Sequence, residues 1–199
     1  EEKFIFIANA RTGSTSMLAS LANVFTGKHP PGRNPYKDIT AEPPEIYHRS
    51  IAAVSKLIPD YEQYFKFCFI RNPWSRFLSS YREFIHPNHS AWAGEISKYK
   101  NFREFCLDFS NTQIKNDIHF LPITEQITID GIVKMDYVAK FENYGAERDL
   151  IWSKLNLPRC RKRHERRTSG PGYEHVYDTS MKKVVESFYH SDISEFKYK

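Results

Sequence analysis

The stretch from Asn9 to Ser16 has the composition of a phosphate-binding loop. It follows an apolar run, Phe4–Ala8, and precedes apolar residues that recur at helical spacing from Met17. Backbone N–H groups between a strand and a helix attract an anion, helped by the positive end of the helix dipole. Gly13 permits close approach of the backbone, and further donors come from Arg11, Thr12, Ser14, Thr15 and Ser16. The alternative interpretation is a hydroxyl-rich cap on a buried helix.

A second candidate anion site follows another apolar run. In FCFIRNPWSRFLSSYREF, Arg71 stands where the strand pattern ends, and Asn72-Pro73 is typical of a helix start. Ser75 and Ser79 are four residues apart and so share one face of that helix. Arg71 and Ser79 can therefore hold a second phosphate, separate from the first. The alternative is a surface arginine beside solvated serines.

Together, the two stretches resemble the donor-binding motifs of sulfotransferases of the carbohydrate type, family 2. The second stretch is the more specific, because it follows the pattern Arg-(Asp/Asn)-Pro-x-x-Arg-x-x-Ser-x-Tyr. The resemblance extends to DYVAKFENY (136–144) and FYHSDISEFKY (188–198). Two residues depart from the family pattern: Arg11 stands where lysine is usual, and Lys197 where glycine is common.

The resemblance implies an enzyme that transfers a sulfuryl group from 3′-phosphoadenosine 5′-phosphosulfate (PAPS) to an acceptor hydroxyl, expected on a carbohydrate. The product of the donor is adenosine 3′,5′-bisphosphate, and no metal is expected. The resemblance assigns the 5′-phosphosulfate to Arg11, Thr12, Gly13, Ser14, Thr15 and Ser16. It assigns the 3′-phosphate to Arg71 and Ser79. Arg11 is also a catalytic candidate, because its charge can neutralise the bridging oxygen as the S–O bond breaks.

Sulfuryl transfer to a hydroxyl needs a base, and imidazole suits neutral pH. In similar enzymes a histidine between the two motifs is the base, and His48 takes that place, 23 residues before Arg71. His119, in NDIHFLP, resembles a histidine near the family's acceptor site and is a substrate-binding candidate. Glu42 and Glu45 are further candidates. Which histidine is the base stays open, since most histidines of a globular chain are surface or structural residues.

The segment RCRKRHERRTSGPGY (159–173) contains the densest cluster of positive charge. It can close over the phosphates of the nucleotide, bind an anionic acceptor, or be a solvated loop. In the family a late basic loop commonly covers the nucleotide, which makes Arg163, Arg166 and Arg167 weaker candidates for donor binding.

Strand and helix patterns alternate along the chain. We expect strands at 4–8, 64–70 and 136–141, and helices from 17 and at 51–58, 72–84, 101–109, 144–155 and 180–189. The alternation predicts an α/β fold, a three-layer parallel sheet with flanking helices on both faces, and the resemblance makes it P-loop-kinase-like. Ligands bind beyond the carboxyl ends of such strands, so one shared site is expected. We expect one domain, 1–199, with a long loop at 28–44.

Composition sets wider bounds. The net charge of +5 favours an anionic small molecule or glycan over nucleic acid as partner. Three distant cysteines argue against a disulfide framework and favour a reducing compartment: Cys68, Cys106 and Cys160. No stretch has the length and apolarity of a membrane span. We therefore expect a cytoplasmic protein, or a Golgi-lumenal one if an upstream anchor has been removed. The oligomeric state and the acceptor stay open.

Two functions of other classes stay open as alternatives. A P-loop-like nucleotide kinase would use ATP and Mg²⁺, but the first loop lacks the Gly-Lys-Ser/Thr ending of such enzymes. A non-catalytic domain would use the same anion cradle to bind a polyanionic glycan or nucleic acid, with salt-dependent affinity.

Overall fold

The computed structural model describes residues 3–26, 48–86, 92–158 and 172–199. The chain divides into two compact units: unit 1 comprises Glu1–Ile70 and Gln126–Arg167, and unit 2 comprises Arg71–Glu125 and Thr168–Lys199. The expected single domain stays a prediction. The loop at 28–44 and residues 159–171 lie outside the described residues, and with them the candidates Glu42, Glu45, Arg163, Arg166 and Arg167. None of the described helices combines the length and apolarity needed to cross a membrane.

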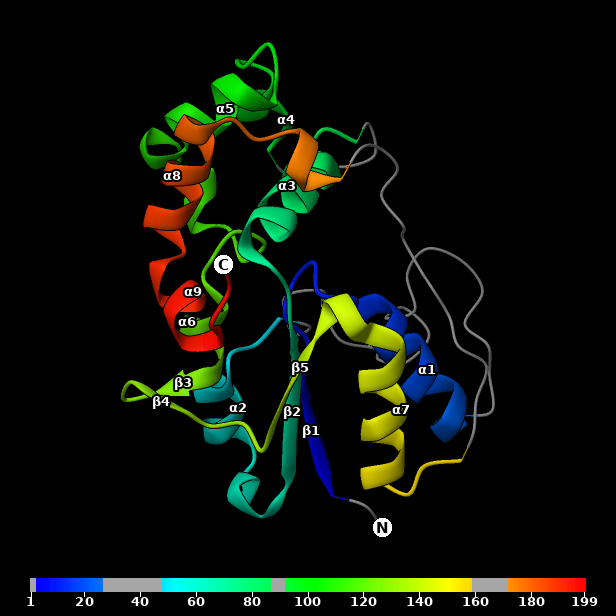
Figure 1. Cartoon of the computed structure of the whole chain (residues 1–199). Coiled ribbons are helices and arrows are strands. Elements are labelled where there is room, and N and C mark those ends of the chain that lie inside the picture. The colour runs from blue at the N-terminus through cyan, green and yellow to red at the C-terminus, as the bar shows by residue number, and fades with distance from the viewer. Residues whose placement is uncertain (1–2, 27–47, 87–91, 159–171) are drawn as a thin grey trace. The chain divides into compact units, whose positions relative to one another are not determined.

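Unit 1 is built on a parallel three-stranded sheet with the order β1-β2-β5 (Figure 1). The strands are β1 (Phe4–Ile7), β2 (Phe65–Ile70) and β5 (Tyr137–Lys140). The central strand β2 is apolar or buried along nearly its whole length, as expected for a strand covered on both faces. The register pairs Ile7 with Cys68. Both strands therefore end at the same edge of the sheet.

Helices cover the two faces of this sheet. The helices α1 (Ser14–Thr26) and α7 (Tyr144–Lys154) lie on one side and α2 (Ile51–Leu57) on the other (Figure 1). One buried cluster joins α1, α7 and the sheet, with Met17, Leu21, Phe67, Phe69, Ile151 and Trp152 among its members. The expected α/β class, with a parallel sheet and flanking helices, is confirmed. Kinship with the P-loop kinases stays a prediction.

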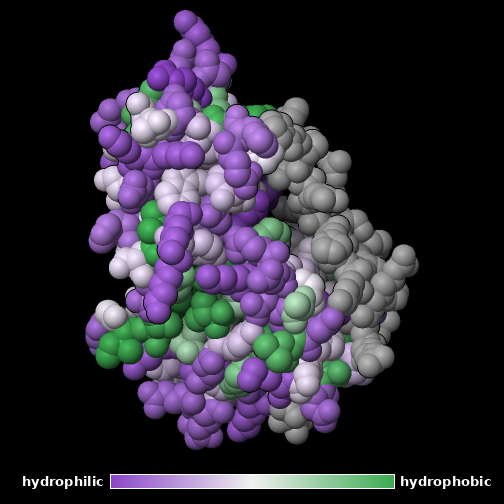
Figure 2. Space-filling model, in the orientation of Figure 1, coloured by the Kyte–Doolittle hydropathy of each residue, from purple (hydrophilic) through white to green (hydrophobic). Residues whose placement is uncertain are grey.

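A short antiparallel hairpin in unit 1 was not expected. It joins β3 (Thr128–Ile129) to β4 (Ile132–Val133). Its two turn residues, Asp130 and Gly131, both have positive φ, as a type I′ turn requires. Ile132 is 60% exposed. Figure 2 shows apolar surface gathered over this hairpin.

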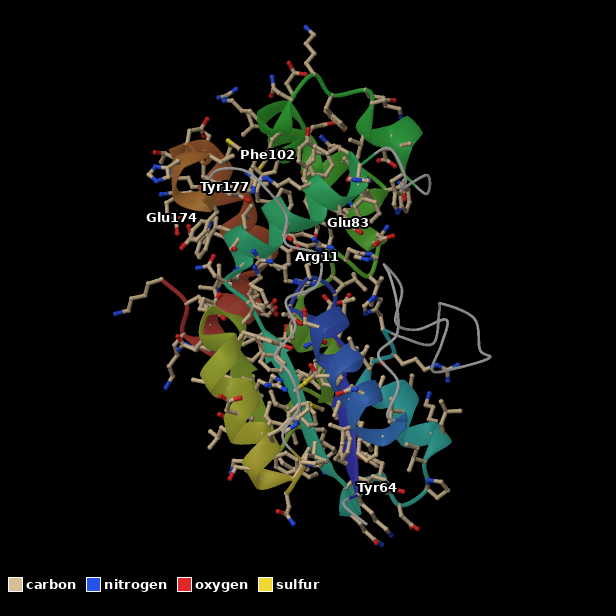
Figure 3. All side chains as sticks on the ribbon, turned by 90° about the vertical axis from the view of Figure 1, so that its right-hand side faces the viewer. Arg11, Tyr64, Glu83, Phe102, Glu174 and Tyr177 are labelled. Atoms are coloured by element: carbon tan, nitrogen blue, oxygen red, sulfur yellow. The ribbon has the colours of Figure 1, made fainter. Side chains whose placement is uncertain are left out.

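Unit 2 is helical. Its helices are α3 (Pro73–Phe84), α4 (Ala93–Ile96), α5 (Phe102–Asp108), α8 (Thr179–Phe188) and α9 (His190–Phe196), and α6 (Ile123–Ile127) contains the boundary between the units. Aromatic rings form the core. The ring of Phe77 on α3 lies edge-on to Phe109 and Phe120, with centroids 4.7 and 5.3 Å away. Phe102 and Tyr177, labelled in Figure 3, meet at right angles at 5.3 Å.

A buried polar network ties α9 to α3 and to the start of α6. The Asp192 carboxylate, 2% exposed, accepts hydrogen bonds of 2.8 Å from the main-chain N–H groups of Ile123 and Thr124. The guanidinium of Arg76 lies 3.9 Å from the same carboxylate and donates to the Leu121 carbonyl at 2.6 Å. Asp192 thus satisfies the first N–H groups of α6, which have no partner within the helix.

Most predicted elements are present within one or two residues of their expected ends. The start of α3 is confirmed: Asn72 Oδ1 accepts from the Ser75 N–H at 3.1 Å, and Pro73 is the first helical residue. Helix α1 begins at Ser14, three residues before Met17, directly after a glycine with φ +81°. Helix α9 was not expected. Its start is not marked in the sequence, because Tyr189 makes no side-chain cap.

Candidate functional site

The loop between β1 and α1 alternates in the sign of φ. Arg11 has φ +63° and Gly13 has φ +81°, whereas Ala10 and Thr12 do not have positive φ. Alternation between right- and left-handed residues turns successive N–H groups toward one concavity, a nest that binds anions. The nest lies directly before the first turn of α1, where the positive end of the helix dipole adds to it. The left-handed backbone at Arg11 costs about 1–2 kcal/mol, a strain typical of functional loops.

Aromatic rings press against this loop at its glycine. A Cβ atom on Gly13 would lie 2.8 Å from Cε2 of Phe141 and 3.2 Å from Cε2 of Tyr144. Phe141 follows β5 directly, and Tyr144 is the first residue of α7. The residue after β5 and the first residue of α7 therefore pack against the loop at position 13, where only glycine fits.

Side chains of the loop brace it from within. Asn9 is fully buried, and its Nδ2 donates to the Phe69 carbonyl on β2 at 3.0 Å. Thr12 is also buried, and its hydroxyl donates to the Asn9 carbonyl at 2.8 Å. The loop is thereby attached to the neighbouring strand. Asn9 was quoted in the sequence motif but not identified as a site residue, and its signal was a polar side chain at the end of an apolar strand.

His48 lies beside the same loop. Its Nδ1 is 2.5 Å from the carbonyl oxygen of Ala8, the residue that follows β1. A carbonyl can only accept, so Nδ1 carries the proton and the lone pair of the neutral ring is at Nε2. The contact spans 40 residues of sequence. It places the histidine expected to be the base next to the expected phosphosulfate loop, within unit 1.

Arg71 and Ser79 belong to unit 2. Arg71 is the residue after β2, and its Nε donates to Ser75 Oγ, one helical turn further, at 3.0 Å. This bond holds the guanidinium against the first turn of α3. Ser79 lies deeper on the same helix and is 3% exposed.

His119 is also in unit 2, paired with a carboxylate. Its Nδ1 is 2.7 Å from Asp117 Oδ1. Burial acts to raise the pKa of Asp117, but hydrogen bonds from His119 and from the Trp92 indole outweigh it and lower the pKa to about 2. Asp117 is therefore ionised at neutral pH. Neither Asp117 nor Trp92 was a sequence candidate, although Asp117 lies only two residues before the histidine.

The candidate residues thus form two groups, one in each unit. In unit 1 the structure brings His48 beside the loop with Arg11, Thr12 and Gly13, which leads directly into Ser14, Thr15 and Ser16 in the first turn of α1. In Figure 3 Arg11 is at the carboxyl end of the sheet, and Tyr64 is at the opposite end. In unit 2, Arg71 precedes α3 by two residues, and α3 contains Ser79 and contacts His119 through the ring of Phe84.

Comparison with known proteins gives one match. The model of the sulfotransferase family matches residues 2–199. Neither the curated proteins nor the solved structures contain a match. The family match spans both units and every candidate residue, including the loop before α1 with its alternating φ and the capped start of α3. The chain therefore belongs to the sulfotransferase family.

Proposed function

We propose that this chain transfers the sulfuryl group of PAPS to a hydroxyl of a carbohydrate acceptor. The observation that best supports this proposal is the nest at Arg11 and Gly13 with a histidine beside it. Sulfuryl transfer needs an anion cradle and a base close together, and unit 1 brings together a candidate for each. Membership of the sulfotransferase family supports the reaction class.

The residues of the loop fit a phosphosulfate by their chemistry. The nest offers main-chain N–H groups, and Ser14, Thr15 and Ser16 add hydroxyl donors at the start of α1. Arg11 adds a cation with a planar fork suited to phosphate oxygens. In the proposed reaction these groups neutralise the charge that develops on the phosphate oxygen, without reorganising at the moment of transfer.

We assign the 3′-phosphate of the donor to Arg71 and Ser79, as the family motif implies. The bond from Arg71 to Ser75 supports this assignment, because it orients the guanidinium before a ligand arrives. Binding the far end of the donor fixes the direction of the sulfuryl group and so favours in-line attack.

His48 is the proposed base. The S–O bond that joins the sulfuryl group to the 5′-phosphate breaks as the acceptor oxygen bonds to sulfur. The electron pair of the broken bond stays on the phosphate oxygen, and adenosine 3′,5′-bisphosphate leaves. The acceptor proton passes to Nε2 of His48. The Ala8 carbonyl accepts a hydrogen bond from Nδ1–H and so favours the tautomer that has its lone pair at Nε2. Arg11 remains the proposed residue for leaving-group charge.

The donor assignment predicts that Arg71→Ala weakens binding of adenosine 3′,5′-bisphosphate. We expect a loss of at least about tenfold, because hydrogen bonds to charged groups contribute about 1.5–3 kcal/mol. Calorimetric titration measures the affinity for adenosine 3′,5′-bisphosphate. Arg103→Ala is the matched control, since Arg103 is an exposed arginine of the same unit that pairs with Asp178. Unchanged affinity in Arg71→Ala would refute the assignment.

The base assignment predicts that His48→Ala loses turnover but keeps donor binding. The expected loss is about 10²–10⁴-fold, the usual contribution of a general base. Transfer of radiolabelled sulfate from PAPS in an acceptor screen gives the rate, and calorimetry gives the affinity for the bisphosphate. His175→Ala, at an exposed histidine of unit 2, is the control. Near-normal turnover of His48→Ala would show that another group is the base.

The alternative functions differ in their requirements. A nucleotide kinase would show ATP- and Mg²⁺-dependent phosphate transfer, which the same screen can include. A binding domain would retain anionic glycans at low salt, lose them as salt rises, and transfer no sulfate.

A further inference from the structure

The hydrogen-bond ladder between β1 and β2 changes its donor at Asn9. In a parallel pair every second residue of one strand bonds to the neighbouring strand. Along β1 this series begins at Lys3, whose carbonyl accepts from the Phe65 N–H at 3.0 Å, and it continues through the odd-numbered residues to Ile7. Asn9 is the next member of the series. By the register of the two strands, its main-chain N–H is the donor expected at the Phe69 carbonyl of β2.

Asn9 bonds to that carbonyl with its side chain instead. Its Nδ2 donates to the Phe69 carbonyl at 3.0 Å, while its main-chain N–H turns back to the Ile7 carbonyl, also at 3.0 Å. A bond between residues two apart is a γ-turn, which is common where strands end. Two N–H donors of one residue therefore compete for one carbonyl oxygen, and the side chain occupies it.

The γ-turn sets the direction of the Ala8 carbonyl. This carbonyl and the Asn9 N–H belong to one planar peptide unit, so neither can rotate without the other. The Ala8 carbonyl accepts from His48 Nδ1, with 2.5 Å between the two atoms. If the main-chain N–H of residue 9 returned to the Phe69 carbonyl, the Ala8 carbonyl would turn with it and leave the imidazole.

Stability alone does not explain an asparagine at this position. Asn9 is fully buried, and its Oδ1 has no hydrogen-bond partner in the described part of the chain. A buried amide oxygen without a donor costs free energy, which a leucine of similar shape would avoid. Local costs of this kind are concentrated at functional sites. What leucine cannot supply is a side-chain N–H for the Phe69 carbonyl.

We propose that Asn9 is a positioning residue for His48. By occupying the Phe69 carbonyl, its side chain keeps the peptide between Ala8 and Asn9 in the γ-turn, and so keeps the Ala8 carbonyl on Nδ1 of the imidazole. This inference rests on the proposed function, in which His48 is the base. Because Asn9 is fully buried, it acts on the reaction through the main chain and not by contact with either substrate.

The position of the peptide is tested without turnover, by NMR of the whole chain with Asn9→Leu. Nitrogen-15 shifts give the tautomer of His48, and scalar couplings across hydrogen bonds identify the acceptor of the residue-9 amide. In the unmodified chain we expect the Nδ1–H tautomer and a coupling to Ile7. In Asn9→Leu we expect a mixture of tautomers and a coupling to Phe69. Asn9→Ala, which cannot overpack the site, should show the same changes, and an unchanged tautomer and γ-turn in both variants would overturn the proposal.

Gln126→Leu is the matched control. Gln126 is a buried amide side chain of unit 1, 2% exposed, and neither of its amide atoms has a hydrogen-bond partner within residues 3–26, 48–86, 92–158 and 172–199. Both leucine variants should leave the midpoint of chemical unfolding unchanged or raise it, since each removes an unpaired buried amide group. Only Asn9→Leu should alter the tautomer of His48. A lowered midpoint with an unchanged tautomer would show that Asn9 is merely structural, and would overturn the proposal.

The consequence for catalysis is tested by steady-state transfer of radiolabelled sulfate from PAPS. In Asn9→Leu we expect kcat to fall about tenfold or more, because misplacing a reacting group by about 1 Å can cost on the order of 10²-fold. The Kd for adenosine 3′,5′-bisphosphate should change by less than about threefold, because Gly13 still packs against its aromatic neighbours. An unchanged kcat, or equal losses in kcat and affinity, would overturn the proposal. Absence of transfer by the unmodified chain would count against the proposed function instead, and the tautomer test would still decide the role of Asn9.

Discussion

Gly13 is held by two constraints that can be separated by substitution. Its φ of +81° lies in the left-handed region, and its Cα faces the rings of Phe141 and Tyr144. Two other glycines serve as comparisons, one with the backbone strain alone and one with neither factor. Gly131 has φ +74° but nothing within 4 Å of the point where a Cβ would stand, and Gly94 has neither positive φ nor a neighbour within that distance. The three positions together separate backbone strain from steric contact.

We predict a graded series for the three alanine variants. Gly13→Ala should destabilise most, by more than the roughly 1–2 kcal/mol of left-handed strain, because a ring must also move. Gly131→Ala should lose about 1 kcal/mol from strain alone. Gly94→Ala, in a helix, should be neutral or gain about 0.5–1 kcal/mol. Chemical unfolding measures each, and equal losses at positions 13 and 131 would contradict the contact with Phe141.

The sequence predicts a binding loop before the first helix, but it does not predict which residues pack against that loop. Glycine and hydroxyl residues after an apolar run are local information, and they predict an anion cradle at this loop. The bond from His48 to the Ala8 carbonyl depends on how the chain returns after 40 residues, which no local pattern contains. The hydrogen bond between His119 and Asp117 could be predicted from the sequence, since NDIHFLP has a carboxylate two residues before the histidine.

At the scale of elements, the buried carboxylate of α9 is a long-range helix cap. Asp192 binds two N–H groups at the start of α6, and Arg76 of α3 lies beside it. Removing one member of a buried pair of charges leaves the other charge buried and uncompensated, which costs about 3–5 kcal/mol. Helix α9, helix α3 and the start of α6 should therefore depend on this one side chain.

We predict that Asp192→Ala destabilises the protein by about 3–5 kcal/mol in chemical unfolding. Asp178→Ala is the control, because Asp178 caps α8 through the Met181 N–H but is exposed, and a surface cap contributes about 1 kcal/mol. Replacing both Arg76 and Asp192, as Arg76→Met with Asp192→Leu, should recover part of the loss. Equal effects of the two aspartate substitutions would show that burial of Asp192 adds nothing.

Element prediction succeeded where the determinants are local. The start of α3 follows from Asn72-Pro73, and β1 and β2 follow from their apolar runs. The hairpin at 128–133 was missed although Asp130-Gly131 between β-branched residues is its signal. The start of α6 could not be predicted, because the carboxylate that caps it is almost 70 residues away.

At the scale of the whole molecule, four aspartates among the residues that the structure describes have a lowered pKa. Burial acts to raise the pKa of Asp117 and Asp136, and hydrogen bonds outweigh it. Hydrogen bonds are the largest effect at Asp108 and Asp178. Each carboxyl has a lower pKa folded than unfolded, so its contribution to stability is present above about pH 4 and is lost as pH falls toward 2. The raised pKa of Glu125 acts in the opposite direction.

We therefore predict that the free energy of unfolding falls between about pH 4 and pH 2. Three of the four aspartates belong to unit 2, so its amide hydrogens should lose protection first when hydrogen exchange is followed during acidification. In Asp117→Asn the fall should be smaller by on the order of 2 kcal/mol, the equivalent of its pKa shift. A slope identical to that of the unmodified chain would show that Asp117 does not contribute to acid stability.

The interleaved composition of the two units has a consequence for synthesis on the ribosome. The strand β1 emerges early, but its unit also needs the residues that follow position 125, and the aromatic core of unit 2 needs the last helices. Neither unit can finish folding while the nascent chain is short, and neither can be excised as one contiguous fragment. Apolar segments that are synthesised early stay exposed to solvent until the residues that pack against them have been synthesised. We therefore expect the growing polypeptide to fold slowly and to bind chaperones.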